Sequence, residues 1–376
     1  MSTHHRIAVV GAGLGGLTLA RVLRVHGIEA AVYDQETSRD VRHQGGMLDI
    51  HEESGQAALS AAGLLADFRP LVLPGGEATR VLDRNAEVRM ARDDDGTGGR
   101  PEVERGRLRD LLLDSLPEGT VRWGAKATAV RTLDDGRHEV TLADGSVFTA
   151  DLLVGADGAW SRVRPLLSGA LPAYTGFSMV EVNLRDADAR HPVSASVVGA
   201  GTLFALGAER GLLAHRESDG GLHVYATFKV PENWVSTLDF TDTATAKEAV
   251  LARFPDWHPS LRALVADADG ALVPRPVHAL PVGHRWERVP GVTLLGDAAH
   301  LMSPFAGEGA NLAMIDGAGL GLALAAHPGD TEGALAAYER VMFARSEAAA
   351  AESAAGLTLC FAADAPRGLL EMFASV

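Results

Sequence analysis

The sequence predicts an α/β protein with a parallel sheet covered by helices, an inserted mainly β segment, and a long helix near the C-terminus. Three observations predict this fold class. The chain opens with an apolar strand, a glycine-rich turn and a helix. Apolar strands end at an aspartate at Asp34, Asp157 and Asp297. Between residues 171 and 273, short apolar–polar alternation is interrupted by turn signals, which is typical of antiparallel strands.

Length and composition narrow the class of protein. The 376 residues suit about two domains, and 47% of them are hydrophobic, which allows a large core. With 34 basic and 49 acidic residues, the net charge of −15 argues against a nucleic-acid or anionic-membrane partner. Cys360 is the single cysteine, which excludes an intrachain disulfide and a cysteine-based metal site and favours a cytoplasmic location. The first apolar run, Ile7 to Val10, is too short for a signal peptide or a membrane span.

The first element is a buried strand over Ile7–Val10 that leads directly into Gly11-Ala12-Gly13-Leu14-Gly15-Gly16. A helix should follow to about His26, and a second strand over Glu29–Tyr33 ends at Asp34. This is a G-x-G-x-x-G motif in a β-α-β context with an acid after the second strand, which is the dinucleotide-binding arrangement of a Rossmann-like domain.

Each part of the motif has a physical role. Gly11 allows the tight turn, Gly13 lets the backbone approach a pyrophosphate, and Gly16 lets helix and strand pack closely. Asp34 is placed to accept hydrogen bonds from ribose hydroxyls. The motif alone does not distinguish FAD from NAD.

The next segments alternate between helix and strand. A short helix is expected over Gly55–Ala66, and two strands, Thr79–Leu82 and Glu87–Met90, form an antiparallel excursion. The helix that starts at Arg105 has arginines in its first turn, where the helix dipole does not favour them. Such arginines suit a bound phosphate or flavin edge, although an exposed basic turn stays open for Arg107 and Arg109.

The stretch from Val292 to Asn311 ends a strand at Gly296-Asp297, crosses a Pro/Gly loop and enters a helix near Gly309. The Asp297 carboxylate can accept a hydrogen bond from a ribitol hydroxyl, and the helix N-terminus offers N–H groups to an anion or electron-rich ring. Because the carboxyl ends of parallel strands share one rim, the aspartates at three strand ends indicate one long cofactor.

The last segments are helical. A helix rich in small residues is expected over Ala310–Ala326, too short and interrupted to span a membrane. A long alanine-rich helix should run from Thr331 to about Leu359 and brace two domains. A further helix over Thr243 to about Phe254 closes the inserted β segment, which suits a lid over a cofactor ring.

Three motifs together, Gly11–Gly16, Gly155-Ala156-Asp157-Gly158 and Gly296-Asp297-Ala298-Ala299-His300, resemble the fingerprints of the FAD-dependent aromatic hydroxylases. These class A flavoprotein monooxygenases have the p-hydroxybenzoate hydroxylase fold. More narrowly, Gln44–His51, His300–Gly307 and the C-terminal helix resemble the tetracycline-inactivating flavin monooxygenases. The resemblance covers essentially the whole chain.

The resemblance implies a division of the chain. A discontinuous Rossmann-like FAD-binding domain would comprise residues 1–67, 105–170 and 274–328. A mainly β substrate-binding domain would comprise residues 68–104 and 171–273, and residues 329–376 would form a helical segment that bridges the two.

It also implies site residues. Asp34 would hold the ADP half of FAD, Asp297 the ribitol, and Asp49 and Arg105 the flavin side. The full cofactor set is Gly11, Gly13, Gly16, Asp34, Arg42 (where NADPH would approach), Asp49, Arg105, Asp157 (shared between FAD and NAD(P)H), Asp297, Pro304, Gly307 and Asn311.

The expected substrate contacts are His223, Phe305, Val180 and Thr202, although an ordinary strand histidine stays open for His223. The sequence departs from the tetracycline-inactivating enzymes here. Val180 and Thr202 stand where those enzymes have a glutamine and an arginine. The other departures are Gly356 for an asparagine, Cys360 for a methionine and Ser303 for a proline. Losing polar anchors should change specificity more than chemistry.

The implied function is an FAD-dependent monooxygenase in which NAD(P)H reduces the flavin and O2 forms a C4a-hydroperoxide. The substrate would be a phenolic, polycyclic or polyketide-like molecule, and whether tetracyclines are accepted stays open. Because the cofactor performs the chemistry, no catalytic side chain and no metal is expected. We expect a cytoplasmic monomer or weak homodimer with no nucleic-acid or membrane partner. An FAD-dependent oxidase or dehydrogenase, or a non-catalytic flavin- or drug-binding protein, remains the alternative.

Overall fold

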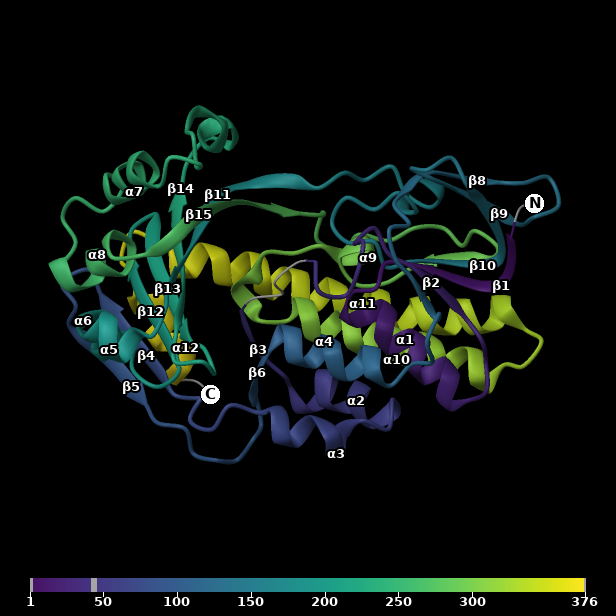
Figure 1. Cartoon of the computed structure of the whole chain (residues 1–376), viewed down its shortest axis with the longest axis horizontal. Helices are drawn as coiled ribbons and strands as arrows, with labels where there is room; N and C mark the ends of the chain where they lie inside the picture. Colours follow the sequence, from purple (N-terminus) through teal and green to yellow (C-terminus); the bar gives the residue numbers. More distant parts are fainter. Residues whose placement is uncertain (1–2, 42–45, 375–376) are drawn as a thin grey trace.

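The computed structural model describes residues 3–41 and 46–374. It shows an elongated molecule with a sheet at each end and the long helix α11 running between them (Figure 1). The predicted α/β class is confirmed.

The first sheet has seven strands in the order β7-β2-β1-β10-β9-β8, with β16 also paired to β10. Its strands are β1 (Thr3–Val10), β2 (Ala31–Tyr33), β7 (Val121–Arg122), β8 (Ala127–Thr132), β9 (His138–Leu142), β10 (Val147–Gly155) and β16 (Val292–Leu294). The apolar runs in β1, β10 and β16 are buried, as expected for parallel strands covered on both faces.

The register of the parallel strands brings the predicted motifs together. Val10 of β1 lies opposite both Tyr33 of β2 and Gly155 of β10. Gly155 in turn lies opposite Leu294 of β16. The four strands therefore end side by side, and the residues that follow them share one rim of the sheet.

Two helices cross in close contact on this sheet, α1 (Leu14–Val25) and α10 (Gly309–Ala326). A Cβ atom at Gly317 would overlap the Gly15 carbonyl oxygen and would lie 2.9 Å from the Leu19 nitrogen. A Cβ at Gly15 would lie 2.6 Å from the Ala313 carbonyl oxygen. The small residues of both helices are therefore needed for backbone-to-backbone packing.

Smaller elements complete this end of the molecule. They are β3 (Met47–Asp49), β6 (Glu102–Glu104), α2 (Ala57–Ala61), α3 (Leu65–Phe68), α4 (Arg105–Asp114) and α9 (Asp297–His300). The helix predicted over residues 55–66 is instead a π-helical turn, Glu52–Gln56, followed by the two short helices α2 and α3. Strands β3 and β6 pair with each other in a separate two-stranded sheet.

The second sheet also has seven strands, in the order β15-β11-β14-β13-β12-β4-β5. Its strands are β4 (Thr79–Asp83), β5 (Val88–Arg92), β11 (Ala173–Leu184), β12 (Thr202–Gly207), β13 (Arg210–Arg216), β14 (Leu222–Lys229) and β15 (Asp269–Ala279). Strand β15 pairs with β11 as far as Ala279, so residues 274–279 belong to this sheet and not to the first one. The predicted boundary at residue 274 therefore falls within β15. The domain division as a whole stays a prediction.

One face of the second sheet is covered by α5 (Ala187–Arg190), α6 (Pro192–Val198), α7 (Thr243–Leu251) and α8 (Pro259–Ala266). The sequence predicted only α7. On the other face, Val81, Leu206 and Leu213 form an apolar cluster with Phe361 and Leu369 from the C-terminal segment.

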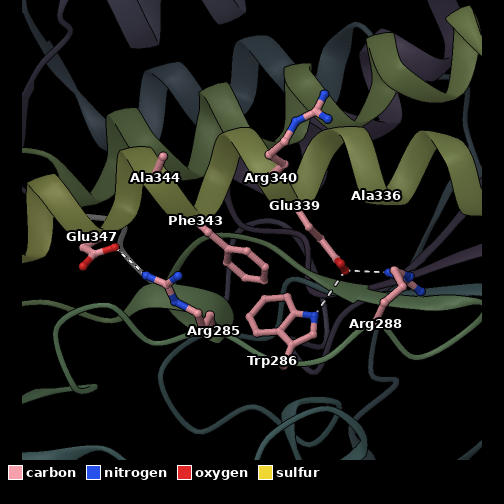
Figure 2. Close-up of a pocket in the computed structure, with 9 residues that line it drawn as sticks. All are labelled: Arg285, Trp286, Arg288, Ala336, Glu339, Arg340, Phe343, Ala344 and Glu347. Atoms are coloured by element: carbon pink, nitrogen blue, oxygen red, sulfur yellow. Dashed lines mark hydrogen bonds and ion pairs between the residues drawn. The ribbon is translucent and has the colours of Figure 1, made fainter.

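Helix α11 (Thr331–Cys360) joins the two ends of the molecule, as predicted. Near its start, the buried Glu339 carboxylate accepts hydrogen bonds from Trp286 Nε1 at 3.1 Å, Arg288 Nη1 at 2.6 Å and Thr293 Oγ1 at 2.7 Å. Figure 2 shows Glu339, Trp286 and Arg288 meeting beside the helix. Its far end carries Cys360 into the apolar cluster of the second sheet, next to α12 (Arg367–Ala374).

Among the described residues, α10 alone has the length and composition of a membrane span, with a mean hydropathy of 1.3. Half of that helix is buried within the protein, where it packs against α1 and α11. The core helix of a protein can have the same length and mean hydropathy as a membrane span.

The helix crossing makes a paired prediction. Replacing Gly317 with Ala should destabilise the protein by about 1–3 kcal/mol, because the added methyl overpacks the contact with α1. Gly319 of the same helix is the matched control, since a Cβ there would meet only Tyr338 Cδ2 at 4.0 Å. Gly319→Ala should be neutral or stabilising by up to about 1 kcal/mol through helix propensity. Urea unfolding of both variants tests this, and equal stabilities would contradict the packing argument.

Candidate cofactor and substrate site

The glycine-rich turn is locked between two strand ends. Gly11 has φ +111°, and a Cβ on it would overlap the Ala156 carbonyl oxygen. Its N–H donates to the Tyr33 carbonyl at 2.7 Å, while the Ala156 N–H donates to the Val10 carbonyl at 2.8 Å. Only glycine fits both the conformation and the space.

Asp34 supports this turn directly. Its carboxylate accepts the Ala12 N–H at 2.6 Å and the Glu36 N–H at 2.8 Å. Arg109 is also buried here and donates to the Ala12 carbonyl at 3.3 Å and to Glu36 Oε2 at 2.8 Å. The interpretation of this segment as an exposed basic turn is therefore wrong for Arg109. It holds for Arg107, which is exposed. The sequence missed Arg109 because its partner Glu36 lies 73 positions away.

The N-terminus of α1 is open to an anion. Gly13, the residue before the helix, has extended backbone, and a Cβ there would meet no atom within 4 Å. No side chain caps this helix, and its first turn has no acidic residue. Free N–H groups beside open space fit a pyrophosphate.

Asp297 begins the short helix α9 at the end of β16. It is exposed to solvent yet closely surrounded by protein, and desolvation raises the pKa of its carboxyl. The neighbouring charges of His300 and Arg105 act in the opposite direction. An accessible carboxyl in such surroundings is suited to accept a hydrogen bond from a hydroxyl group of a bound ligand.

The turn that presents Asp297 is held by Asp316 of α10, which is completely buried. Its carboxylate accepts the Gly296 N–H at 3.0 Å, His300 Nε2–H at 2.5 Å and Arg345 Nη2–H at 2.6 Å. Burial alone would raise the pKa of Asp316, but the His300 and Arg345 charges lower it. The role of Asp316 could not be predicted from the sequence, because an acid within a glycine-rich helix belongs to no motif.

Asp157 follows β10 on the same rim. Its carboxylate accepts Ser161 Oγ–H at 2.6 Å and the Arg162 N–H at 2.6 Å, so it organises the turn after the strand. Burial raises its pKa despite these hydrogen bonds. Its side chain therefore fixes backbone next to the glycine-rich turn.

The loop between α9 and α10 contacts β3. A Cβ at Gly307 would lie 3.0 Å from Asp49 Oδ2. The Asn311 side chain is fully buried, accepts the His51 N–H at 3.0 Å and donates to the Asp49 carbonyl at 2.8 Å. Because the amide of Asn311 is bonded to the protein backbone, Asn311 orders this loop and does not present its side chain to a ligand. The sequence did not identify His51, whose ring bonds to Asp49 and to Glu308.

A row of polar side chains crosses the second sheet on the face opposite helices α5–α8, the same face that carries the apolar cluster with the C-terminal segment. His223 Nδ1–H donates to Asn183 Oδ1 at 2.8 Å, and a hydrogen bond of 3.1 Å joins His215 Nδ1 and Thr202 Oγ1. His215 and His223 are directly opposite each other on β13 and β14. Burial, and next the nearby His223, lower the pKa of His215 to about 4, so it is neutral. The structure thus brings His223 and Thr202 together.

Val180 does not belong to this face. It is fully buried in the core between the second sheet and its covering helices. Side chains alternate along a strand, and Asn183, the partner of His223, has the opposite parity from Val180. The expectation that Val180 contacts substrate is therefore wrong, and Glu181 and Met179 point to the face that carries His223.

Phe305 lies against the aromatic residues of the C-terminal segment. Its ring makes an edge contact with Phe361 at 5.2 Å, and Phe361 stacks on Phe177 at 4.9 Å. A Cβ at Gly356 would lie 2.6 Å from the Phe305 carbonyl oxygen, so glycine is required there. Ser303 and Ser353 exchange hydrogen bonds of 2.6 Å between this loop and α11.

The other predicted site residues are placed as follows. Pro304 is exposed at the start of the loop turn. Arg105 begins α4, and its N–H donates to the Gly46 carbonyl at 3.1 Å. The positive charge of Arg105 opposes the rise in pKa that burial causes at both Asp297 and Tyr225. Arg42 lies outside the described residues.

Comparison with known proteins agrees with this arrangement. Residues 4–353 match the family described as FAD binding domain. The chain belongs to this family. It is 30% identical to the monooxygenase asqM of Emericella nidulans, over 99% of this chain and 98% of that protein.

Two solved structures share the fold. HpxO of Klebsiella pneumoniae, complexed with FAD and uric acid, has a TM-score of 0.80 at 23% identity and covers 99% of this chain and 92% of its own. The tetracycline destructase Tet(51) has a TM-score of 0.73 at 18% identity, over 100% of this chain and 95% of its own. These likenesses confirm the predicted fold, and the family confirms FAD as the cofactor.

The Asp316 network makes a prediction. Asp316→Asn should destabilise the protein by about 3–5 kcal/mol, because it leaves the buried His300 and the partly exposed Arg345 without their charged partner. Thermal and urea unfolding measure the change. Asp135→Asn is the control, since Asp135 pairs with Arg137 on the surface and its loss should change stability little. Equal effects of both substitutions would show that the buried network does not support the turn.

Proposed function

We propose that this chain is an FAD-dependent monooxygenase that uses NAD(P)H and O2 to hydroxylate a phenolic, polycyclic or polyketide-like molecule. The observation that carries the proposal is the strand register, in which Val10, Gly155 and Leu294 are side by side. It aligns the three motifs along one rim of the sheet, outside the carboxyl ends of the strands, where ligands of such sheets bind.

FAD, when bound, supplies the electron transfer from nicotinamide and the activation of oxygen. The chain's own residues bind and orient it. The α1 N-terminus at Gly13 would hold the pyrophosphate, Asp34 the adenosine ribose and Asp297 the ribitol. The loop with Pro304 and Gly307, together with Asp49 and Arg105, would surround the ring. Arg42 would contact the nicotinamide co-substrate. Asp157 would hold the backbone of the rim in the conformation that both FAD and the nicotinamide co-substrate need.

The substrate would lie between this loop and the face of the second sheet that carries His223. His223 and Thr202 would supply hydrogen bonds, and Phe305 with Phe361 would supply an apolar wall that excludes water. Relatives that act on aromatic compounds support this class of substrate, among them a 3-amino-4-hydroxybenzoate 2-monooxygenase of Streptomyces platensis. A cytoplasmic location, a monomer or weak dimer, and the absence of nucleic-acid or membrane partners are part of the same proposal.

Purified protein tests the proposal. It should take up FAD and oxidise NADPH faster when one of a panel of tetracyclines, anthracyclines, naphthols or phenols is present, and the product should gain one oxygen by mass. An oxidase would instead need no nicotinamide and form peroxide with its product. Binding without stimulated turnover would favour a sequestration protein.

The open space at Gly13 predicts a separation of binding from folding. Gly13→Val should raise the dissociation constant of FAD by tenfold or more, about 1.4 kcal/mol, because the side chain fills the space of the pyrophosphate. Unfolding of the cofactor-free protein should not change, since the backbone at Gly13 is extended and nothing lies within 4 Å of the new Cβ. Fluorescence titration with FAD and thermal unfolding measure the two quantities. Unaltered FAD affinity would remove Gly13 from the site.

The two faces of the second sheet predict different variants. His223→Ala should raise KM for the substrate while FAD affinity stays the same. Val180→Ala, on the core face, should leave KM unchanged and cost about 1–3 kcal/mol of stability through the cavity it creates. Steady-state kinetics and urea unfolding distinguish them, and a KM effect at Val180 would contradict the assignment of faces.

A further inference from the structure

His51 lies immediately after β3 and is completely buried. Its Nε2 is 2.9 Å from Asp49 Oδ2, and its Nδ1 is 3.1 Å from Glu308 Oε1. A carboxylate oxygen can only accept, so each ring nitrogen must donate, and both must therefore carry a proton. The geometry points to a buried imidazolium between two carboxylates.

The charges around the ring agree. Burial alone would lower the pKa of His51, but hydrogen bonds to Asp49 and Glu308 raise it to about 9. Arg100 opposes this shift and lies 4.0 Å from Asp49. Glu102 pairs with Asp49 across β3 and β6, and burial raises its pKa well above its usual range, so it adds little negative charge.

These contacts join two segments that are distant in the sequence. Asp49 is the last residue of β3, whereas Glu308 directly precedes α10 and follows Gly307. The backbone N–H of His51 also donates to Asn311 of α10 at 3.0 Å. The ring and main chain of His51 thus hold β3 against the loop that the proposed function places around the flavin ring.

We propose that His51 is a positioning residue whose positive charge clamps Asp49 to Glu308 and so sets the loop of residues 303–309 for FAD. The inference rests on the proposed function for the location of the ring. His51 itself touches neither cofactor nor substrate and acts through its two carboxylate partners.

The clamp has a definite pH dependence. Folding raises the pKa of His51 above the ordinary value of 6.5, so its contribution is complete below about pH 6.5. The contribution decreases as the pH rises toward about 9, where the ring loses its proton and one carboxylate is left without a donor. FAD affinity should decline over the same window.

The test compares His51→Asn and Glu308→Gln with the unmodified chain, using FAD titrations and the flavin absorption spectrum between about pH 6 and 9.5. At neutral pH, His51→Asn should raise the dissociation constant of FAD about tenfold and alter the spectrum, because a charge-assisted hydrogen bond is lost. It should also abolish the decline of affinity with pH. Glu308→Gln should shift that decline to lower pH, since one carboxylate no longer favours the protonated ring.

His138→Asn is the matched control. His138 is equally buried but contacts Thr132 and the Pro290 carbonyl, and burial lowers its pKa, so it is neutral. This variant should lose stability while it keeps the pH profile and spectrum of the unmodified chain. A His51→Asn or Glu308→Gln protein with the unmodified pH profile would overturn the inference alone. An unmodified chain that does not bind FAD would overturn the proposed function and the inference with it.

Discussion

The buried carboxylate of Asp316 is the interaction on which the rest of the structure depends. It accepts hydrogen bonds from a strand end, from the turn that follows and from α11, through Gly296, His300 and Arg345. A buried charge is stable only when it is paired and fully hydrogen-bonded. The end of β16, the one-turn helix α9, helix α10 that carries Asp316, and helix α11 must therefore assemble together. Asp297 is next to Gly296, so the proposed ribitol contact is fixed by a network that it does not join.

The sequence predicted the parts of the fold that are local or periodic. The strand–glycine–helix motif and the strand-end aspartates implied a common rim, and the register of β1, β10 and β16 confirms it. Helices α6 and α8 were missed because they are only 7 and 8 residues long, and tertiary packing decides the conformation of such short segments. Val180 was misplaced because the face of a strand depends on its register, and a shift of one residue reverses every side chain.

Long-range partners explain the other surprises. Arg109, His51 and Asp316 bond to residues that are 73, 257 and 20 positions away, respectively. No motif in one sequence connects such positions, because each pair is defined by the fold and not by spacing. The sequence could indicate that a basic or acidic group was present, but only the structure shows which charges meet. Those pairs hold the motif residues in place together with Asp34 and Asp157, which bond to the backbone of neighbouring turns.

Three of the departures from the tetracycline-inactivating pattern, at Gly356, Ser303 and Cys360, lie where the loop after α9 meets α11 and the C-terminal segment. Gly356 has no side chain at the point where α11 meets the Phe305 carbonyl, and Ser303 bonds to Ser353 of the same helix. Both changes bring the loop after α9 closer to α11 than a larger or less polar pair would allow. Cys360 is smaller than the methionine in that pattern and lies in the same apolar cluster. The chain thus keeps the parts suited to FAD and reshapes the wall beside Phe305. A flavin enzyme with a changed substrate specificity would have this structure. The wall beside Phe305 can change while Asp297, His51 and the glycine-rich turn keep their positions.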